Sequence, residues 1–321
     1  MKMKIGILAY ENCTASMITS MMDILALANT QRAGRRPFFE TIVITRKGRA
    51  VNSFTGYPVS SSVSIKSMQR YDLVYVPGFL ADPVATIERE HESISWLKAL
   101  HRRGVKLCAA CNGNLLLAEA GIFNGKTATT HWSLKDFFMD RYPLVRLKPE
   151  KIIVDEGDVV SAGGVTACMN LAIYLVAKYM SADIALSCSK IFLVDSGRKL
   201  QTPYLIFTAP RSHGDKDIVQ LQDWIEDHYQ GEVTVDLLMS ESSMSRRTLV
   251  RRFKSATGDT PLEYLQRVRV ENAKRSLETT NKTFSEITWD VGYNDISSFQ
   301  RLFKEHTRLT PREYRGKFAM E

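Results

Sequence analysis

One segment of the chain occurs twice, and this repeat constrains the fold more than any other feature of the 321 residues. The stretch 249–264 reads LVRRFKSATGDTPLEY, and the stretch 299–314, fifty residues further on, reads FQRLFKEHTRLTPREY. Eight of the sixteen aligned positions are identical: Arg251/Arg301, Phe253/Phe303, Lys254/Lys304, Thr257/Thr307, Thr260/Thr310, Pro261/Pro311, Glu263/Glu313 and Tyr264/Tyr314. Chance rarely produces such a match, so we expect two copies of one structural unit.

Each copy contains the start of a helix. Thr260 stands where an N-cap is needed, Pro261 takes the first helical position, and Glu263 follows three residues after the cap. This is a capping box with a preset first φ angle, and residues 310–313 repeat it.

A second, amphipathic helix precedes each of these starts. Leu249 and Phe253 are four residues apart and therefore share one buried helix face, as do Phe299 and Phe303. The opposite face carries Arg246, Arg247, Arg251 and Lys254 in the first copy, and Ser297, Ser298, Gln300, Arg301 and Lys304 in the second.

A short helix and a tight turn come before each amphipathic helix. We expect short helices at 235–240 and 285–291, with Ser245 and Asp295 as the N-caps of the helices that follow and Gly292 in a left-handed turn. This layout is typical of helix-turn-helix units, which we place at about 235–256 and 285–306.

The segment between the two units is long enough to form a rigid spacer helix over 262–279. It places five apolar residues on one side: Leu262, Leu265, Val268, Ala273 and Leu277.

Basic residues gather around the repeat, although the whole C-terminal part is not basic. The chain has a net charge of +8, of which residues 1–214 contribute +9 and residues 215–321 contribute −1. Locally, 245–275 holds nine basic and three acidic residues, and 296–317 holds six and two. Two basic patches separated by acidic stretches fit a surface that meets phosphate at two places. We interpret the +9 of the first part as a solvated surface.

The segment 218–316 resembles the AraC/XylS family of regulators, and the motif IxxxVGYxDxSSFQRLFKEHTxLTPREYR carries the resemblance. It implies two recognition helices that enter successive major-groove segments on one face of double-stranded DNA. Two residues depart from the family pattern: Arg308 stands where glycine is usual, whereas the first copy keeps Gly258, and Thr288 stands where alanine is usual.

Positions within the two helices divide the candidate DNA contacts. Five side chains are best placed for base edges, and Arg251 and Arg301 among them could each bind a guanine in a bidentate manner. These five are Arg247, Arg251, Ser297, Gln300 and Arg301. Lys254 and Lys304 are expected to hold phosphate.

The first part of the chain alternates strand and helix signals. Short apolar runs at 5–9, 41–45, 73–76 and 105–110 are of strand length, and 17–28, 87–101 and 165–180 are helix-like. This pattern predicts an α/β doubly wound, flavodoxin-like and mainly parallel sheet, with a hairpin over 152–161. We therefore divide the chain into an α/β sensor domain (1–195), a linker (196–216) and an all-α tandem helix-turn-helix domain (217–321).

A cysteine follows one of the predicted strands at a sharp turn into a helix. The stretch VKLCAACNGNLLLAEAGIFNGKTATTHW places Cys111 at such an elbow, near a helix N-terminus that favours a thiolate. Together with YDLVYVPGF and SAGGVTACMNLAIYLV, it resembles the ThiJ/PfpI branch of the class I glutamine amidotransferase-like superfamily over about 1–190.

The catalytic partners that this resemblance implies are replaced. Active relatives have histidine directly after the cysteine, where this chain has Asn112, and an acidic residue at the place of Met17. We therefore assign no catalytic residue and expect Cys111, Asn112 and His131 to line a ligand pocket. Cys108 and Cys111 form a C-x-x-C that we interpret as two buried cysteines, without a metal site.

The whole chain resembles AraC-family regulators that carry a ThiJ/PfpI-like N-terminal domain. We expect a sequence-specific DNA-binding transcription regulator and not an enzyme, with double-stranded DNA as partner, a homodimeric assembly, a small-molecule effector and no cofactor. Five scattered cysteines and the lack of a long apolar run predict a cytoplasmic protein without membrane association. The alternatives are a ThiJ/PfpI-type enzyme that uses Cys111 and a regulator that senses redox state through Cys111.

Overall fold

Seven strands form one sheet in the first of the two units into which the chain divides, Met1–Gln201 and Thr202–Glu321. The computed structural model describes residues 2–32 and 36–319. The strand order is β10-β11-β7-β6-β1-β2-β5, and all neighbours pair in parallel except β10 and β11. The strands are β1 (Met3–Leu8), β2 (Phe39–Thr45), β5 (Val63–Ser64), β6 (Leu73–Val76), β7 (Lys106–Ala110), β10 (Ile153–Asp155) and β11 (Val159–Ala162). The prediction of a mainly parallel α/β sheet is confirmed.

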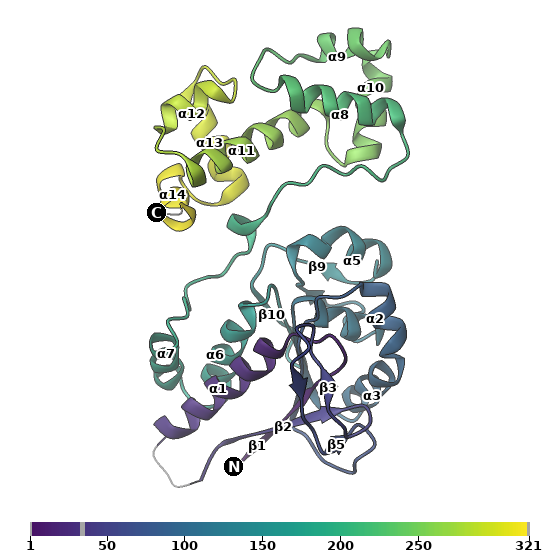
Figure 1. Cartoon of the computed structure of the whole chain (residues 1–321), viewed down its shortest axis with the longest axis vertical. Coiled ribbons are helices and arrows are strands. Elements are labelled where there is room, and N and C mark those ends of the chain that lie inside the picture. Colours follow the sequence, from purple (N-terminus) through teal and green to yellow (C-terminus); the bar gives the residue numbers. More distant parts are fainter. Residues whose placement is uncertain (1, 33–35, 320–321) are drawn as a thin grey trace. The chain divides into compact units, whose positions relative to one another are not determined.

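Helices cover both faces of this sheet, as parallel strands require. In Figure 1, α1, α6 and α7 lie together on one side of the sheet, and α2 and α3 lie on the other. The helices are α1 (Ala15–Gln31), α2 (Pro83–Arg89), α3 (His91–Arg102), α4 (Asn114–Glu119), α5 (Lys135–Arg141), α6 (Ala167–Tyr179) and α7 (Ala182–Ile191). Two short strand pairs complete the unit, β3 (Val51–Asn52) with β4 (Pro58–Val59), and β8 (Thr127–Ala128) with β9 (Arg146–Leu147).

One predicted helix, 87–101, is wrong, because it is two helices that meet at Glu90. This residue is only 2% exposed, and its carboxylate accepts a hydrogen bond of 2.7 Å from the Ser93 hydroxyl. The chain turns at Glu90 to bury that side chain, and apolar periodicity carries no signal for such a break.

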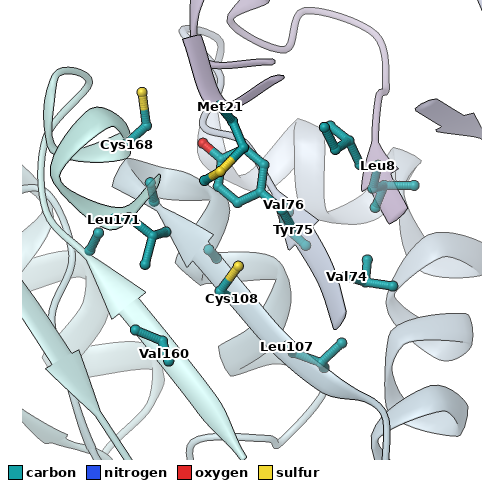
Figure 2. Close-up of a cluster of buried hydrophobic side chains, with 14 of the residues drawn as sticks. Leu8, Met21, Val74, Tyr75, Val76, Leu107, Cys108, Val160, Cys168 and Leu171 are labelled. Atoms are coloured by element: carbon teal, nitrogen blue, oxygen red, sulfur yellow. The ribbon is translucent and has the colours of Figure 1, made fainter. Parts of the chain in front are cut away.

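The sheet core is made of aliphatic, aromatic and sulfur-containing side chains. Figure 2 shows Cys108 of β7 in a hydrophobic cluster that also contains Tyr75, Met21 and Leu171. Cys108 is fully buried and, like the other four cysteines, free. Burial raises the pKa of the Cys108 thiol well above its ordinary value. The interpretation of Cys108 as an inert core residue therefore fits its surroundings.

Seven helices form the described part of the second unit. They are α8 (Lys216–His228), α9 (Val235–Ser242), α10 (Arg246–Thr257), α11 (Pro261–Thr279), α12 (Phe284–Asp290), α13 (Ile296–Thr307) and α14 (Pro311–Phe318). The predicted capping boxes are present at Thr260 with Glu263 and at Thr310 with Glu313. Gly292 has a φ of 82°, which is the left-handed turn expected between α12 and α13.

The long helix α11 is shared between two separate hydrophobic cores. Its N-terminal part, which includes Leu265 and Val268, packs with α8, α9 and α10, whereas Val270 and Leu277 pack with α12, α13 and α14. Each helix-turn-helix unit thus has its own core. The predicted apolar side of α11 is wrong at Leu262, which is 42% exposed.

The expected linker, 196–216, is not a free connector. Gln201 is 2% exposed and donates hydrogen bonds to the carbonyl oxygens of Thr130 (2.8 Å) and Lys151 (2.9 Å), which ties it to the first unit. Further along, the Phe207 ring contacts Tyr264 with centroids 5.4 Å apart, within the second unit. Apolar residues are sparse in this connecting segment, but Gln201 and Phe207 each have a packed partner.

Among the residues that the structure describes, none of the helices is both long and apolar enough to cross a membrane.

Candidate nucleic-acid interface and cysteine elbow

Helix α10 presents a basic face because its apolar residues are committed to the core. Ser245 caps its N-terminus by accepting a hydrogen bond from the Thr248 amide (3.4 Å), and Leu249 and Phe253 are fully buried. Four exposed side chains lie on the other face and, with Val250 and Ser255, line a shallow surface hollow. These four are Arg246, Arg247, Arg251 and Lys254.

Helix α13 has the same design with a less charged face. The Asp295 carboxylate caps it by accepting hydrogen bonds from the amides of Ser297 (3.1 Å) and Ser298 (3.2 Å). Phe299 and Phe303 are fully buried, and the outward face exposes Ser297, Gln300, Arg301 and Lys304.

Ser298 is less available than the other predicted contacts of α13. It is half-buried, and its hydroxyl donates a hydrogen bond to the Asp295 carboxylate. The Arg301 guanidinium in turn donates to the Ser298 hydroxyl oxygen (3.1 Å), which holds the arginine along the helix surface. Ser298 therefore helps to orient Arg301 in the structure as it stands.

One arginine of α10 is excluded from the basic face. Arg252 forms ion pairs with Asp215 (2.6 Å) and Asp217 (2.8 Å) at the start of α8. The helical phase separates it from Arg251, which is exposed. Two adjacent arginines thus have different tasks, since one braces α10 against α8 and the other faces outward.

Each copy contains a tyrosine, identical in the two repeats, whose ring packs against the buried phenylalanine of the outward-facing helix. The Tyr264 hydroxyl donates to Glu226 of α8, and the Tyr314 hydroxyl donates to Glu278 of α11 (2.6 Å). Burial and the neighbouring carboxylate raise the pKa of both tyrosines. The two glutamates lie outside the repeated sixteen residues, so the repeat alone could not reveal them.

The turn after α13 carries arginine in a conformation that favours glycine. Arg308 has a φ of 62°, and Gly258 has a φ of 83° at the equivalent place after α10. A left-handed backbone costs a residue with a Cβ on the order of 1 kcal/mol.

Arg308→Gly should therefore raise the free energy of unfolding by up to about 1 kcal/mol, less the entropy that glycine loses on folding. The matched variant Gly258→Ala should lower it by about 1 kcal/mol, since no atom lies within 4 Å of the added Cβ and only the backbone is strained. Urea unfolding of both variants measures the two changes. A loss of stability in Arg308→Gly would mean that the arginine side chain stabilises the turn.

Cys111 occupies the predicted sharp turn, between β7 and a short 3-10 helix (Cys111–Gly113). Its φ is 56°, a left-handed value that is strained for cysteine. The turn is tightly packed, because a Cβ on Gly113 would lie 2.4 Å from the Pro77 carbonyl oxygen and one on Gly78 would lie 2.9 Å from the Cys111 Cβ. The elbow is present as expected, but it is closed: Cys111 is only 4% exposed.

The chemistry of this elbow differs from the thiolate that we expected. Burial raises the pKa of the Cys111 thiol to about 11, and a hydrogen bond from the Asn112 backbone offsets this only in part. The Asn112 side chain does not face Cys111 as a base would; its Oδ1 accepts a hydrogen bond from the Phe79 amide (3.2 Å). Met17 is fully buried beside Gly78. Its apolar thioether thus occupies the place near the elbow where the resemblance implies an acidic side chain in active relatives.

His131 has a structural role in the turn that follows. Its Nδ1 lies 2.7 Å from the Ser133 hydroxyl and accepts a hydrogen bond from the Ser133 amide (3.2 Å), which caps a 3-10 helix (Trp132–Leu134). Burial lowers the pKa of His131, which favours the neutral imidazole. Its neighbour Thr130 donates a hydrogen bond to the Cys111 carbonyl oxygen (3.1 Å), which links this turn to the elbow.

The three residues expected to line a ligand pocket lie in one part of the fold, but Cys111 and Asn112 are closed to solvent. Asn112 is only 8% exposed, and His131 is half-buried. Of the two surface hollows described in the chain, one follows α10 and the other, about 470 Å³, lies at Glu119, Arg141 and Tyr142. Neither is lined by Cys111. A ligand at Cys111 would require the elbow to open.

A neutral thiol predicts slow alkylation. Iodoacetamide should react with Cys111 barely at pH 7 and progressively faster as the pH approaches 11. Because the folded pKa is raised above its ordinary value of 9.0, the group's contribution to stability is present below pH 9 and is lost between pH 9 and 11. Mass spectrometry of the native chain, with Cys111→Ser as the control, measures the rate. Rapid labelling at pH 7 would refute this reading of the elbow.

Within residues 2–32 and 36–319, no group of three or more His, Cys, Asp and Glu side chains is arranged to hold a metal ion.

Two charged residues inside the spacer helix were missed by sequence reasoning. Arg269 and Lys274 of α11 are 9% and 6% exposed. Lys274 Nζ lies 2.7 Å from the Glu271 carboxylate and also donates to the Leu205 carbonyl oxygen. A charged residue on a long helix is usually solvated, so composition gave no signal for these two.

Family models match both parts of the chain. The model of the DJ-1/PfpI family matches residues 15–178, and a model described as a helix-turn-helix domain matches residues 238–317.

Two transcriptional regulators are similar to this chain over nearly its whole length. The HTH-type transcriptional regulator CdhR of Pseudomonas aeruginosa is 28% identical over 299 residues, which cover 92% of this chain and 87% of that protein. The HTH-type transcriptional regulator GbdR of the same species is 25% identical over 315 residues, covering 97% and 83%.

Among solved structures, Drosophila melanogaster DJ-1beta superposes with a TM-score of 0.52 at 18% identity, over 61% of this chain and 100% of that one. At that identity the likeness concerns the fold alone.

Proposed function

The chain belongs to the DJ-1/PfpI family and carries an AraC-type helix-turn-helix domain, and from this premise we propose that it is a sequence-specific DNA-binding transcription regulator. The observation that carries the proposal is the paired design of α10 and α13. Each helix is capped at its N-terminus, buries two apolar residues in its own core and turns a polar face to solvent.

The two faces differ in what they offer DNA. In this proposal Arg247 and Arg251 of α10 bind base edges in one major-groove segment. Gln300 and Arg301, with Ser297, do the same from α13 in the next segment. Lys254 and Lys304 neutralise phosphates, which positions the protein without specifying sequence. Ser298 and Arg246 contribute at the margins of these contacts, since Ser298 is used in the helix cap and Arg246 lies at the first residue of α10.

The first unit acts in this proposal as a regulatory domain and not as an enzyme. Cys111 is buried as a neutral thiol, and the groups beside it are an amide and a thioether in place of a base and a carboxylate. The same burial argues against Cys111 as a redox sensor, because such cysteines are exposed thiolates. The roles left to the unit are dimerisation and the binding of a small-molecule effector, which would shift the arrangement of the DNA-binding units.

Selection of bound sequences from random duplex DNA by the full-length chain tests this function. We expect enrichment of a motif with two blocks whose centres are about one helical turn, ~10 base pairs, apart. A doubled motif would support the homodimer. A variant in which Arg251 and Arg301 are both alanine provides the control and should enrich a motif that has lost its preference at one base pair in each block. If the wild-type chain binds every duplex equally at moderate salt, the proposal of sequence-specific regulation fails.

A further inference from the structure

Arg269 lies at the point where α11 passes from one hydrophobic core to the other. Val268, directly before it, packs with the first helix-turn-helix core, and Val270, directly after it, packs with the second. Arg269 itself is 9% exposed. A guanidinium at this junction is costly to bury, so it needs partners from its surroundings.

Those partners come from both helix-turn-helix units. Arg269 Nε donates a hydrogen bond to the Tyr229 carbonyl oxygen (2.8 Å), and Nη2 donates one to the Gly231 carbonyl oxygen (2.8 Å). Both acceptors lie in the loop between α8 and α9 of the first helix-turn-helix unit. On the other side, its guanidinium carbon lies 5.1 Å from the centre of the Tyr293 ring, in the turn between α12 and α13. One side chain thus connects the α8–α9 loop of the first helix-turn-helix unit to the α12–α13 turn of the second helix-turn-helix unit.

The α8–α9 loop and the α12–α13 turn pack so closely that they leave no room for a side chain at Gly292. Gly292, beside Tyr293, has a φ of 82°, and a Cβ there would lie 2.5 Å from the Gln230 carbonyl oxygen and 2.9 Å from Arg269 Nη2. The backbone of the α12–α13 turn therefore packs directly against the backbone of the α8–α9 loop. Tyr229 packs against both cores as well.

The hydrogen bonds of Arg269 restrict the orientation of its guanidinium group more than a salt bridge to a mobile surface carboxylate would. Both of its described hydrogen bonds go to main-chain carbonyl oxygens, which are fixed by the loop backbone. A planar guanidinium forms such bonds in a rigid fork, whereas an ammonium group acts as a point charge. The two helix-turn-helix units are thereby held at one angle and one distance.

We propose that Arg269 is a positioning residue that fixes the offset between the recognition helices α10 and α13, and so sets the number of base pairs between the two blocks of the DNA site. This inference rests on the proposed function. Arg269 contacts no base in this account; it acts through the two helices that do. DNA recognition is sensitive to this offset, because two helices can enter successive major-groove segments only when their spacing matches the helical repeat.

The test compares duplexes that differ only in the spacing between blocks. The preferred duplex of the wild-type chain is prepared as selected, with one base pair inserted and with one removed, and binding is measured by fluorescence anisotropy. The wild type should bind the altered duplexes at least about tenfold more weakly. Arg269→Met should bind the preferred duplex more weakly and should discriminate among the three spacings less than about threefold.

Three further variants separate positioning from general effects. Arg275→Met removes an exposed charge from the same helix and should keep the wild-type spacing profile. Arg269→Lys keeps the charge without the fork and should give an intermediate profile. Gly292→Ala disturbs the junction from the other side and should relax spacing as Arg269→Met does, so it carries the test if Arg269→Met loses helix content by circular dichroism.

The outcomes distinguish this inference from the function on which it rests. If Arg269→Met and Gly292→Ala retain the full spacing preference of the wild type, the positioning role is refuted while sequence-specific binding stands. If the wild-type chain selects no motif, the proposed function itself fails and the inference with it.

Discussion

Replacing Arg251 or Arg301 with alanine should weaken binding to the preferred duplex by about 1–3 kcal/mol, on the order of tenfold to a hundredfold, and relax specificity at one base pair in each case. The two arginines occupy equivalent places in the repeat, and both are exposed on the outward faces of their helices. In the proposed interface each variant would lose a bidentate pair with guanine, whereas the phosphate contacts would remain. Binding to random duplexes should therefore change little.

Anisotropy titrations against the preferred duplex and against all single substitutions of it measure this effect. Arg275→Ala is the matched control, because it removes the same charge from an exposed position of α11, outside both outward-facing helices. It should leave the base preferences unchanged. An equal loss on preferred and random duplexes in Arg251→Ala would assign that arginine to phosphate.

Phe303→Ala should lower the free energy of unfolding of the second helix-turn-helix unit by about 3–5 kcal/mol. The Phe303 side chain is fully buried, and its ring contacts those of Tyr314 (5.4 Å between centroids) and Phe284 (5.9 Å). The core around it is small, so a cavity there cannot be filled by rearrangement. The first helix-turn-helix unit has its own core, built around the equivalent Phe253, and should stay folded.

Hydrogen exchange resolved by peptide distinguishes local from global loss of structure. Exchange in Phe303→Ala should rise across α12, α13 and α14 and stay near the wild-type rate in α9 and α10. Phe303→Leu, which keeps most of the volume, should cost less than about 1.5 kcal/mol. A uniform rise in exchange across both helix-turn-helix units would mean that α11 makes them unfold together, contrary to the two separate cores.

The repeat made the second unit predictable in detail, because local chemistry determines it. A threonine cap, a proline and a glutamate at fixed spacing specify a helix start wherever they occur, and both capping boxes formed as expected. The same holds for the buried pairs Leu249 with Phe253 and Phe299 with Phe303. The parallel sheet of the first unit was predictable for a similar reason, since its buried strands are short apolar runs between helix signals.

Features that depend on contacts between distant residues were not predictable from the sequence. Nothing in the local pattern marks Arg269 as buried, because its partners lie about forty residues away in the loop after α8. The closure of the Cys111 elbow depends on Gly78 and Pro77, which reach it only through the pairing of β6 with β7. The packing of Gln201 was not predictable likewise, because its partners lie between residues 129 and 151.

The central claim is that two helices of one chain read successive major-groove segments. Methylation interference at guanine N7, which faces the major groove, tests it directly on the duplex that the full-length chain selects. We expect two clusters of interfering guanines on one face of the duplex, about one helical turn apart, with the Arg251→Ala variant losing sensitivity in one cluster and Arg301→Ala in the other. A single cluster per bound chain, or one cluster affected by both variants, would contradict it.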